Sequence, residues 1–122
     1  MRQTDVIPEA TQTAKKQLAA GDISGAERLL FQQLQLTPHD RETHYYYCVC
    51  LRYLTRLSDA RDELETLLGR FPRFARGYQE IGYTFKALND QDKALSSFRT
   101  AVTLNDALLG SWRALIEMTS KT

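Results

Sequence analysis

Two cysteines and two histidines are the residues of this sequence best suited to chemistry. Cys48 and Cys50 lie two positions apart in a helical segment, so their side chains point to nearly opposite faces and cannot chelate one metal ion. His39 lies in a turn, and neither it nor His44 has an acidic or cysteine partner at metal-ligand spacing. The sequence also lacks a recognisable catalytic triad and a glycine-rich phosphate-binding loop. We therefore expect no catalytic residues, no metal, no cofactor and no enzymatic activity.

The composition is that of an ordinary globular protein. Of the 122 residues, 43% are hydrophobic and 25% are charged, which argues against disorder. The net charge of +1 provides no long-range attraction to nucleic acid or anionic lipid, so we expect neither as a partner. Residues 1–10 contain acidic side chains and no continuous apolar run, unlike a signal peptide. The two cysteines are too few for a disulfide framework, which favours a reducing cytoplasm.

Small and large apolar residues recur along the chain at an interval of 34 residues. The alanines of this pattern are Ala26, Ala60 and Ala94, and the large residues four positions later are Leu30, Leu64 and Phe98. Another small residue precedes each alanine, in the order Ala14, Cys48 and Gly82. Helices that cross closely need small side chains at the contact. The pattern therefore predicts three repeats, each built from two antiparallel helices.

The repeats and their turn residues define the expected elements. We predict helices at about residues 8–20, 24–36, 41–54, 58–70, 75–88, 92–104 and 109–120. The turns before the second helices contain Gly21-Asp22, Thr55-Arg56 and Asn89-Asp90. The expected N-caps of those helices are Ser24, Ser58 and Asp92, with Glu27 completing a capping box on Ser24. Residues 1–122 then form a single domain, with repeats at about 7–40, 41–74 and 75–108 and a capping helix at 109–120.

These repeats resemble the tetratricopeptide repeat (TPR) family, whose pattern is W-x2-L-G-x2-Y, then A-x3-F, then P. The best match is the third repeat, with Tyr78, Ile81, Gly82, Phe85, Ala94 and Phe98. The second repeat reads His44, Tyr47, Cys48, Leu51, Ala60, Leu64 and Pro72. The first begins weakly, with Ala10, Thr13 and Gln17 at usually large apolar places. The resemblance implies an all-α, right-handed α-solenoid of seven helices that binds a protein or peptide and catalyses nothing.

The same resemblance implies a concave wall lined by the first helix of each pair. The residues that map onto this wall as a partner-binding groove are Tyr45, Tyr46, Val49, Arg52, Tyr53, Arg76, Gln79, Tyr83, Lys86 and Arg113, together with Thr11 and Lys15. Tyrosine and arginine are enriched in binding hot spots because each combines wide apolar contact with a polar tip. Tyr47 and Tyr78 are instead expected to pack between repeats.

A clamp for the C-terminal carboxylate of chaperones is one use of this family. The residues that form this clamp in the family correspond to Thr11, Lys15, Tyr46, Arg76 and Glu80 of this chain. Only Lys15 and Arg76 have the right charge, and Glu80 would repel a carboxylate, so we expect no such clamp.

Two further interpretations concern the rest of the molecule. Residues 78–82 and 108–115 resemble the repeat region that precedes the catalytic domain of some bacterial sulfotransferases, so the chain could be the non-catalytic part of a larger bacterial enzyme. Alternatively, the array associates with itself through its last helix, where Leu109 and Met118 are expected to be exposed. In that helix Trp112, Leu115 and Ile116 are predicted to cover the third pair, while Ser111, Ala114 and Met118 face outward.

Overall fold

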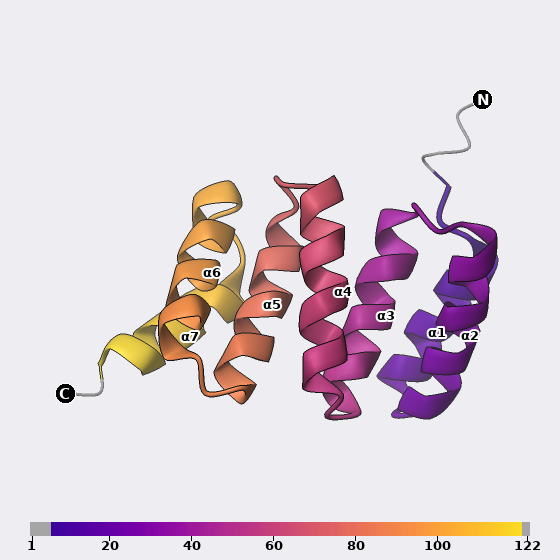
Figure 1. The fold of residues 1–122 in the computed structure, drawn as a ribbon, viewed down its shortest axis with the longest axis horizontal. Helices are drawn as coiled ribbons and strands as arrows, with labels where there is room; N and C mark the ends of the chain where they lie inside the picture. Colours follow the sequence, from indigo (N-terminus) through magenta and orange to yellow (C-terminus); the bar gives the residue numbers. More distant parts are fainter. Residues whose placement is uncertain (1–5, 121–122) are drawn as a thin grey trace. The chain divides into compact units, whose positions relative to one another are not determined.

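A computed structural model describes residues 6–120, and this part of the chain is all-helical (Figure 1). Its helices are α1 (Glu9–Ala19), α2 (Ile23–Leu36), α3 (Arg41–Tyr53), α4 (Leu57–Arg70), α5 (Ala75–Ala87), α6 (Gln91–Leu104) and α7 (Leu109–Thr119). Every helix predicted from the sequence is present, and each end lies within one residue of its predicted place. Within residues 6–120, no helix is long and apolar enough to cross a membrane.

The helices belong to two compact units whose boundary falls inside α4, between Asp59 and Ala60. In the first unit α2 packs against both α1 and α3, and α1 also contacts α3. In the second unit α6 packs against both α5 and α7. The predicted single domain and the bounds of its three repeats stay predictions.

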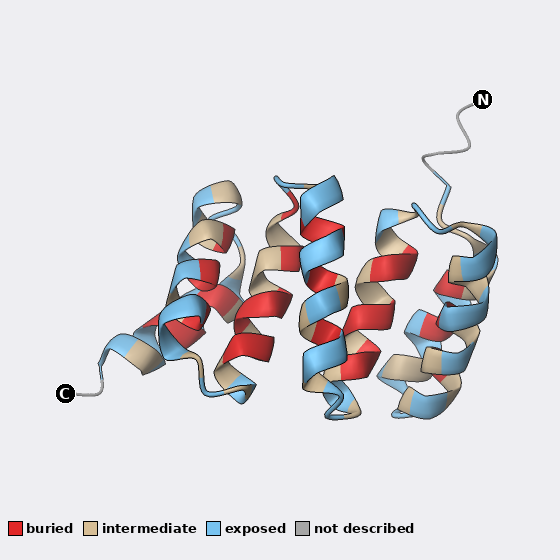
Figure 2. Ribbon diagram, in the orientation of Figure 1, coloured by how far each residue is buried: buried red, intermediate tan, exposed pale blue. Residues whose placement is uncertain are grey.

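The recurring small residues lie in the core, as the 34-residue pattern predicts. Figure 2 shows buried and exposed positions on different sides of α4, whereas α3 and α5 have almost only buried and intermediate positions. The small residues of both helices in each pair are buried. They are Ala14, Cys48 and Gly82 on the first helices, and Ala26, Ala60 and Ala94 on the second helices. The large residues of the pattern, Leu30, Leu64 and Phe98, are completely buried.

The closest helix crossing of the second unit is made by Gly82 of α5. A Cβ atom placed on Gly82 would lie 2.7 Å from Cε1 and 2.8 Å from Cδ1 of Phe98 on α6. Phe98 also makes an edge contact with Tyr83, with ring centroids 5.3 Å apart. Because residue 82 has no side chain, the Phe98 ring can occupy the space beside it.

The predicted N-caps of the second helices were wrong. Ser24, Ser58 and Asp92 all lie inside their helices. The caps of α2 and α6 are Asp22 and Asp90, whose carboxylates accept hydrogen bonds from the backbone N–H groups of Gly25 (3.0 Å) and Lys93 (3.2 Å). A carboxylate at a helix N-terminus also gains from the helix dipole, which favours aspartate over a serine two residues later. The capping box between Ser24 and Glu27 was therefore wrong as well.

The turns before the second helices share one backbone feature. Gly21, Thr55 and Asn89 have φ angles of 88°, 60° and 63°, and they are spaced 34 residues apart. Glycine and asparagine adopt this left-handed conformation readily, whereas a β-branched threonine is strained there. The turn thus repeats even where the residue does not favour it.

The orientation predicted for α7 was also wrong. Ser111, Ala114 and Leu115 form its buried side, whereas Trp112 and Ile116 are exposed. The small residues face inward because α7 lies close to α5. A Cβ atom on Gly110 would meet the hydroxyl oxygen of Tyr83, and Ser111 donates a hydrogen bond to Gln79 Oε1 at 2.8 Å. Of the predicted inward set, only Leu115 is buried.

The contact between Gly82 and Phe98 yields a stability prediction. Gly82→Ala should lower the free energy of unfolding by about 1–3 kcal/mol, because its methyl group overlaps the Phe98 ring in a filled core. Urea denaturation followed by circular dichroism measures this change.

Gly69 on α4 provides the matched control, because a Cβ atom there meets nothing within 4 Å. Gly69→Ala should be neutral or should stabilise by up to about 1 kcal/mol through helix propensity. Equal effects of the two substitutions would contradict the proposed role of the Gly82 crossing.

Candidate functional site

A chain of buried hydroxyl groups joins α1 to α3 in the first unit. Asp40, the N-cap of α3, accepts hydrogen bonds from the backbone N–H (3.0 Å) and the hydroxyl (2.6 Å) of Thr43. The Thr43 hydroxyl lies 2.6 Å from the hydroxyl of Thr11, and both threonines are fully buried. Because Thr43 donates its only hydroxyl proton to Asp40, Thr11 is the donor in the bond between the two threonines.

This connection places Lys15, one turn after Thr11, beside the aromatic residues of α3. The Lys15 ammonium lies 5.3 Å from the ring centroid of Tyr46, a cation–π arrangement. Tyr46 in turn makes an edge contact with Tyr45 at a centroid distance of 5.0 Å. Both tyrosines are half-buried, so each ring is supported by the protein and still has an accessible part.

The predicted groove residues of α3 form a continuous stripe along that helix, which we call the α3 face. It comprises Tyr45, Tyr46, Val49, Arg52 and Tyr53, of which only Tyr53 is largely exposed (58%). At its C-terminal end the Arg52 guanidinium lies 4.7 Å from the ring centroid of Tyr53. The α3 face thus has a cation stacked on a tyrosine ring near each end.

Tyr47 lies on another side of α3 and is buried against Phe31 of α2, with ring centroids 6.0 Å apart. The prediction that Tyr47 serves packing is therefore confirmed. Tyr78 of α5 is half-buried, and its hydroxyl donates a hydrogen bond to the carbonyl of Pro72 at 2.9 Å.

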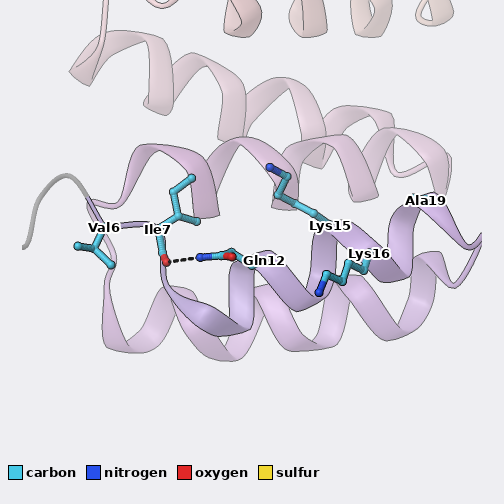
Figure 3. Close-up of a pocket in the computed structure, with 6 residues that line it drawn as sticks. All are labelled: Val6, Ile7, Gln12, Lys15, Lys16 and Ala19. Carbon is cyan, nitrogen blue, oxygen red and sulfur yellow. Dashed lines mark hydrogen bonds between the residues drawn. The ribbon is translucent and has the colours of Figure 1, made fainter.

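An open pocket of about 630 Å³ lies beside α1 (Figure 3). It is lined by Val6, Ile7, Gln12, Lys15, Lys16 and Ala19. The Gln12 amide donates a hydrogen bond to the carbonyl of Ile7 at 3.1 Å, which fixes the segment before α1 against the helix. In the view of Figure 3 the side chains of Ile7 and Lys15 extend to the same side of α1, whereas Lys16 extends to the other.

Of the residues that line this pocket, only Lys15 was predicted from the sequence to belong to a binding site. The signal that could have revealed the pocket is the apolar pair Val6-Ile7 directly before the proline that precedes α1.

In the second unit, most of the predicted groove residues of α5 also hold α7. Gln79 accepts the hydrogen bond from Ser111, and Lys86 forms an ion pair with Glu117 at 3.6 Å. Tyr83 lies against both Phe98 and the backbone at Gly110. These three residues therefore have a packing role whether or not they also contact a partner.

Arg76 and Arg113 complete the predicted set. The Arg76 guanidinium lies 5.0 Å from the ring centroid of Phe74, which is buried at the start of α5. Arg113 is exposed on α7. Arg76 is thus a third cation stacked on an aromatic ring, and here the ring belongs to the core.

The hydrogen bonds between first helices follow the repeat. Thr11 and Thr43 are 32 residues apart, as are Gln79 and Ser111. Gln79 follows Thr11 by 68 residues, which is two periods of 34. The two units therefore use equivalent positions with different side chains for the same connection.

Other side chains that could take part in chemistry lie outside the α3 face. Cys48 and Cys50 are both buried thiols, and no disulfide joins them. Among residues 6–120, no three His, Cys, Asp or Glu side chains are grouped in a way that could hold a metal ion. The hydrogen bond from Arg56 to Asp59 raises the pKa of Arg56 above its ordinary value, so this guanidinium stays charged. It lies directly before α4 and not on the α3 face.

The hydroxyl chain generates a testable order of stabilities. Thr43→Val should lower the free energy of unfolding by about 1–3 kcal/mol, because it removes two buried hydrogen bonds, whereas Thr11→Val removes one and should cost about 0.5–1.5 kcal/mol. The double variant should lose less than the sum of the two, as expected for residues in one network. Urea denaturation of all three variants tests this order.

Thr103→Val is the control, since Thr103 is exposed and bonds only the carbonyl of Arg99 in its own helix. Its effect should stay within about 0.5 kcal/mol. Additive losses at Thr11 and Thr43, or losses no larger than at Thr103, would disprove the coupling.

Comparison with known proteins identifies the fold. No family model matches the sequence, and no curated protein matches it. Among solved structures, the Arabidopsis OM64 TPR domain has a TM-score of 0.86 at 12% identity, covering 93% of each chain. The first TPR of Spaghetti (RPAP3), solved with the HSP90 peptide SRMEEVD, has a TM-score of 0.83 at 12% identity and covers 91% of this chain and 88% of that one.

A third similar structure is YrrB, described as a TPR protein with an unusual peptide-binding site. Its TM-score is 0.79 at 18% identity, with 93% of this chain and 57% of the YrrB chain covered. At such identities the likeness establishes the fold alone. The resemblance seen in the repeats is thereby confirmed: the chain has the all-α helical-repeat fold of TPR proteins.

Proposed function

We propose that this protein is a non-catalytic protein-interaction module that binds a peptide segment of a partner through its first helices. The observation that carries the proposal is the pairing of cations with accessible tyrosine rings on the α3 face. Lys15 lies over Tyr46, and Arg52 lies over Tyr53. Tyr53 is more than half exposed, so its ring is accessible to a partner.

The α3 face has the properties of a binding hot spot. Tyr45 and Tyr46 are half-buried and in edge contact, so little conformational freedom is left to lose when a partner binds. Their rings and Val49 offer apolar contact, while the tyrosine hydroxyls offer hydrogen bonds. A peptide with an aromatic or aliphatic side chain fits this chemistry.

The charge of the proposed binding residues favours an acidic peptide. Lys15 and Arg52 are both cationic, and the α3 face contains no acidic residue. The whole chain carries a net charge of only +1, so this positive charge is a local property of the α3 face and Lys15. Such a local field speeds the encounter with an acidic segment and weakens with added salt.

Two of the structurally similar proteins support the idea of a peptide ligand. Spaghetti (RPAP3) was solved with an HSP90 peptide, and YrrB is described by its peptide-binding site. The step from shared fold to shared function is analogy, and the α3 face supplies the independent argument. The HSP90 tail is not the proposed ligand of this chain, because Glu80 lies at a position where the chaperone-tail clamp attracts a carboxylate.

The proposal predicts a loss of peptide binding on truncation of two residues. Tyr46→Ala together with Arg52→Ala should weaken binding about 10–100-fold, because hot-spot tyrosines and arginines each contribute about 1 kcal/mol or more. Peptides selected from a displayed random library on the wild-type protein provide the ligands. Fluorescence anisotropy measures their dissociation constants, and the selected sequences should be rich in Asp, Glu and aromatic residues.

Phe31→Ala together with Arg99→Ala is the matched control. Both residues are exposed, and they lie on second helices, one in each unit. This control pair should retain affinity within about twofold, and circular dichroism should show that both double variants remain folded. Equal losses in the two variants, or unchanged binding by the Tyr46/Arg52 variant, would refute the proposed surface.

A further inference from the structure

The last helix carries a row of large apolar side chains in contact with solvent. Leu109 is 74% exposed, Trp112 42% and Ile116 64%. Spaced three and four residues apart, they occupy one side of α7, opposite the side that packs on the second unit. The Trp112 indole N–H donates a hydrogen bond to the carbonyl of Asp106 at 2.8 Å, which fixes the ring. We call Leu109, Trp112 and Ile116 the α7 row.

The α7 row is not shaped to receive an ordinary second TPR helix. Ile116 stands in the 34-residue register at the place held by Ala14, Cys48 and Gly82 in the three repeats. At Gly82 even a methyl group would overlap Phe98 of the second helix. The branched side chain of Ile116 therefore excludes the close crossing that the third repeat uses.

The charges beside the α7 row indicate its occupant. Arg113 and Glu117 follow one another four residues apart along the same edge of the row. When two such helices meet antiparallel about a two-fold axis near residue 114, Trp112 faces Ile116 of the other copy. Arg113 then lies within about 3 Å, measured along the helix axis, of Glu117 in the other copy. In a parallel two-fold arrangement the edges that carry Arg113 and Glu117 lie on opposite sides of the contact, so these ion pairs between the copies cannot form.

We propose that the α7 row is a self-association surface, on which a second copy of this chain packs its own α7 in antiparallel orientation. The contact is isologous, with the same residues used by both copies, as a two-fold symmetric dimer requires. Ion pairs between Arg113 and Glu117 fix the direction of the helices, while the apolar row provides the attraction.

The small apolar area of the α7 row limits the strength of this dimer. Three side chains with this exposure offer on the order of 300 Å² of apolar surface per copy, against the ~800 Å² per partner of a stable complex. The dimer is therefore weak and reversible.

Sedimentation velocity of the 122-residue chain between about 1 and 500 µM tests the proposal. The wild-type protein should shift from monomer to dimer across this range, and Leu109→Glu should raise the dissociation constant at least about tenfold. Leu36→Glu is the matched control, because Leu36 is equally exposed (77%) but lies at the end of α2. A wild-type protein that stays monomeric, or an equal effect of the two substitutions, would overturn the proposal.

A charge-exchange experiment tests the antiparallel orientation separately. Arg113→Glu and Glu117→Arg should each weaken self-association several-fold, because each places like charges at both ends of the contact. Glu117 also forms an ion pair with Lys86 of its own chain, so circular dichroism should show that Glu117→Arg remains folded. Mixing the two variants should restore dimers, since the introduced carboxylate of one variant then faces the introduced guanidinium of the other. At the opposite end of the same mixed dimer, the unchanged Glu117 and Arg113 face each other. Self-association that is unchanged by both substitutions would rule out this geometry. So would a mixture that dimerises no more strongly than either variant alone.

Discussion

In each compact unit, a side-chain hydrogen bond joins the first helix of one pair to the first helix of the next. Thr11 bonds Thr43 in the first unit, and Ser111 bonds Gln79 in the second, at equivalent positions of the 34-residue repeat. The first bond is buried and the second is part-buried, and each fixes the separation and rotation of the helices that it joins. The side chains one turn further along, such as Lys15 and Tyr46, then meet at a defined distance.

Small residues let the helices approach closely enough for these bonds. Gly82 admits the ring of Phe98, and Gly110 admits the hydroxyl of Tyr83, so α5 is packed tightly between two neighbours. Close packing of the inner faces leaves the polar and aromatic residues of the first helices on the outside. Which polar and aromatic side chains of the first helices are exposed therefore depends on how the core is packed.

Much of this architecture could be predicted from the sequence because it depends on local and periodic signals. The helices and the buried alanines follow from the repeat of small and large residues, and they appear where predicted. The caps did not follow, because Asp22 and Asp90 accept the hydrogen bonds of the first backbone N–H groups two residues before the expected Ser24 and Asp92. The orientation of α7 was mispredicted because Gly110 and Ser111 allow a close approach to α5 that periodicity alone does not reveal. The pocket beside α1 depends on how the segment before the helix folds back, which no repeat encodes.

The candidate site was predictable in composition but not in arrangement. The tyrosines and arginines of α3 could be identified from the repeat, whereas the stacking of Lys15 on Tyr46 and of Arg52 on Tyr53 needed coordinates. Three predicted residues of α5 turned out to hold α7 as well, because the repeat gives their register and not their neighbours. The α3 face, with its two cation–ring pairs, is thus the part of the proposed binding site with the strongest physical support.

The central claim is that a partner peptide binds the first helices of the array. The most direct test is the map of backbone amide shifts in the NMR spectrum of the protein as a selected acidic peptide is added. We expect the largest changes at Lys15, Tyr46 and Arg52, with the outer sides of α2 and α6 unaffected. Changes concentrated on those second helices, with α1 and α3 silent, would contradict the account.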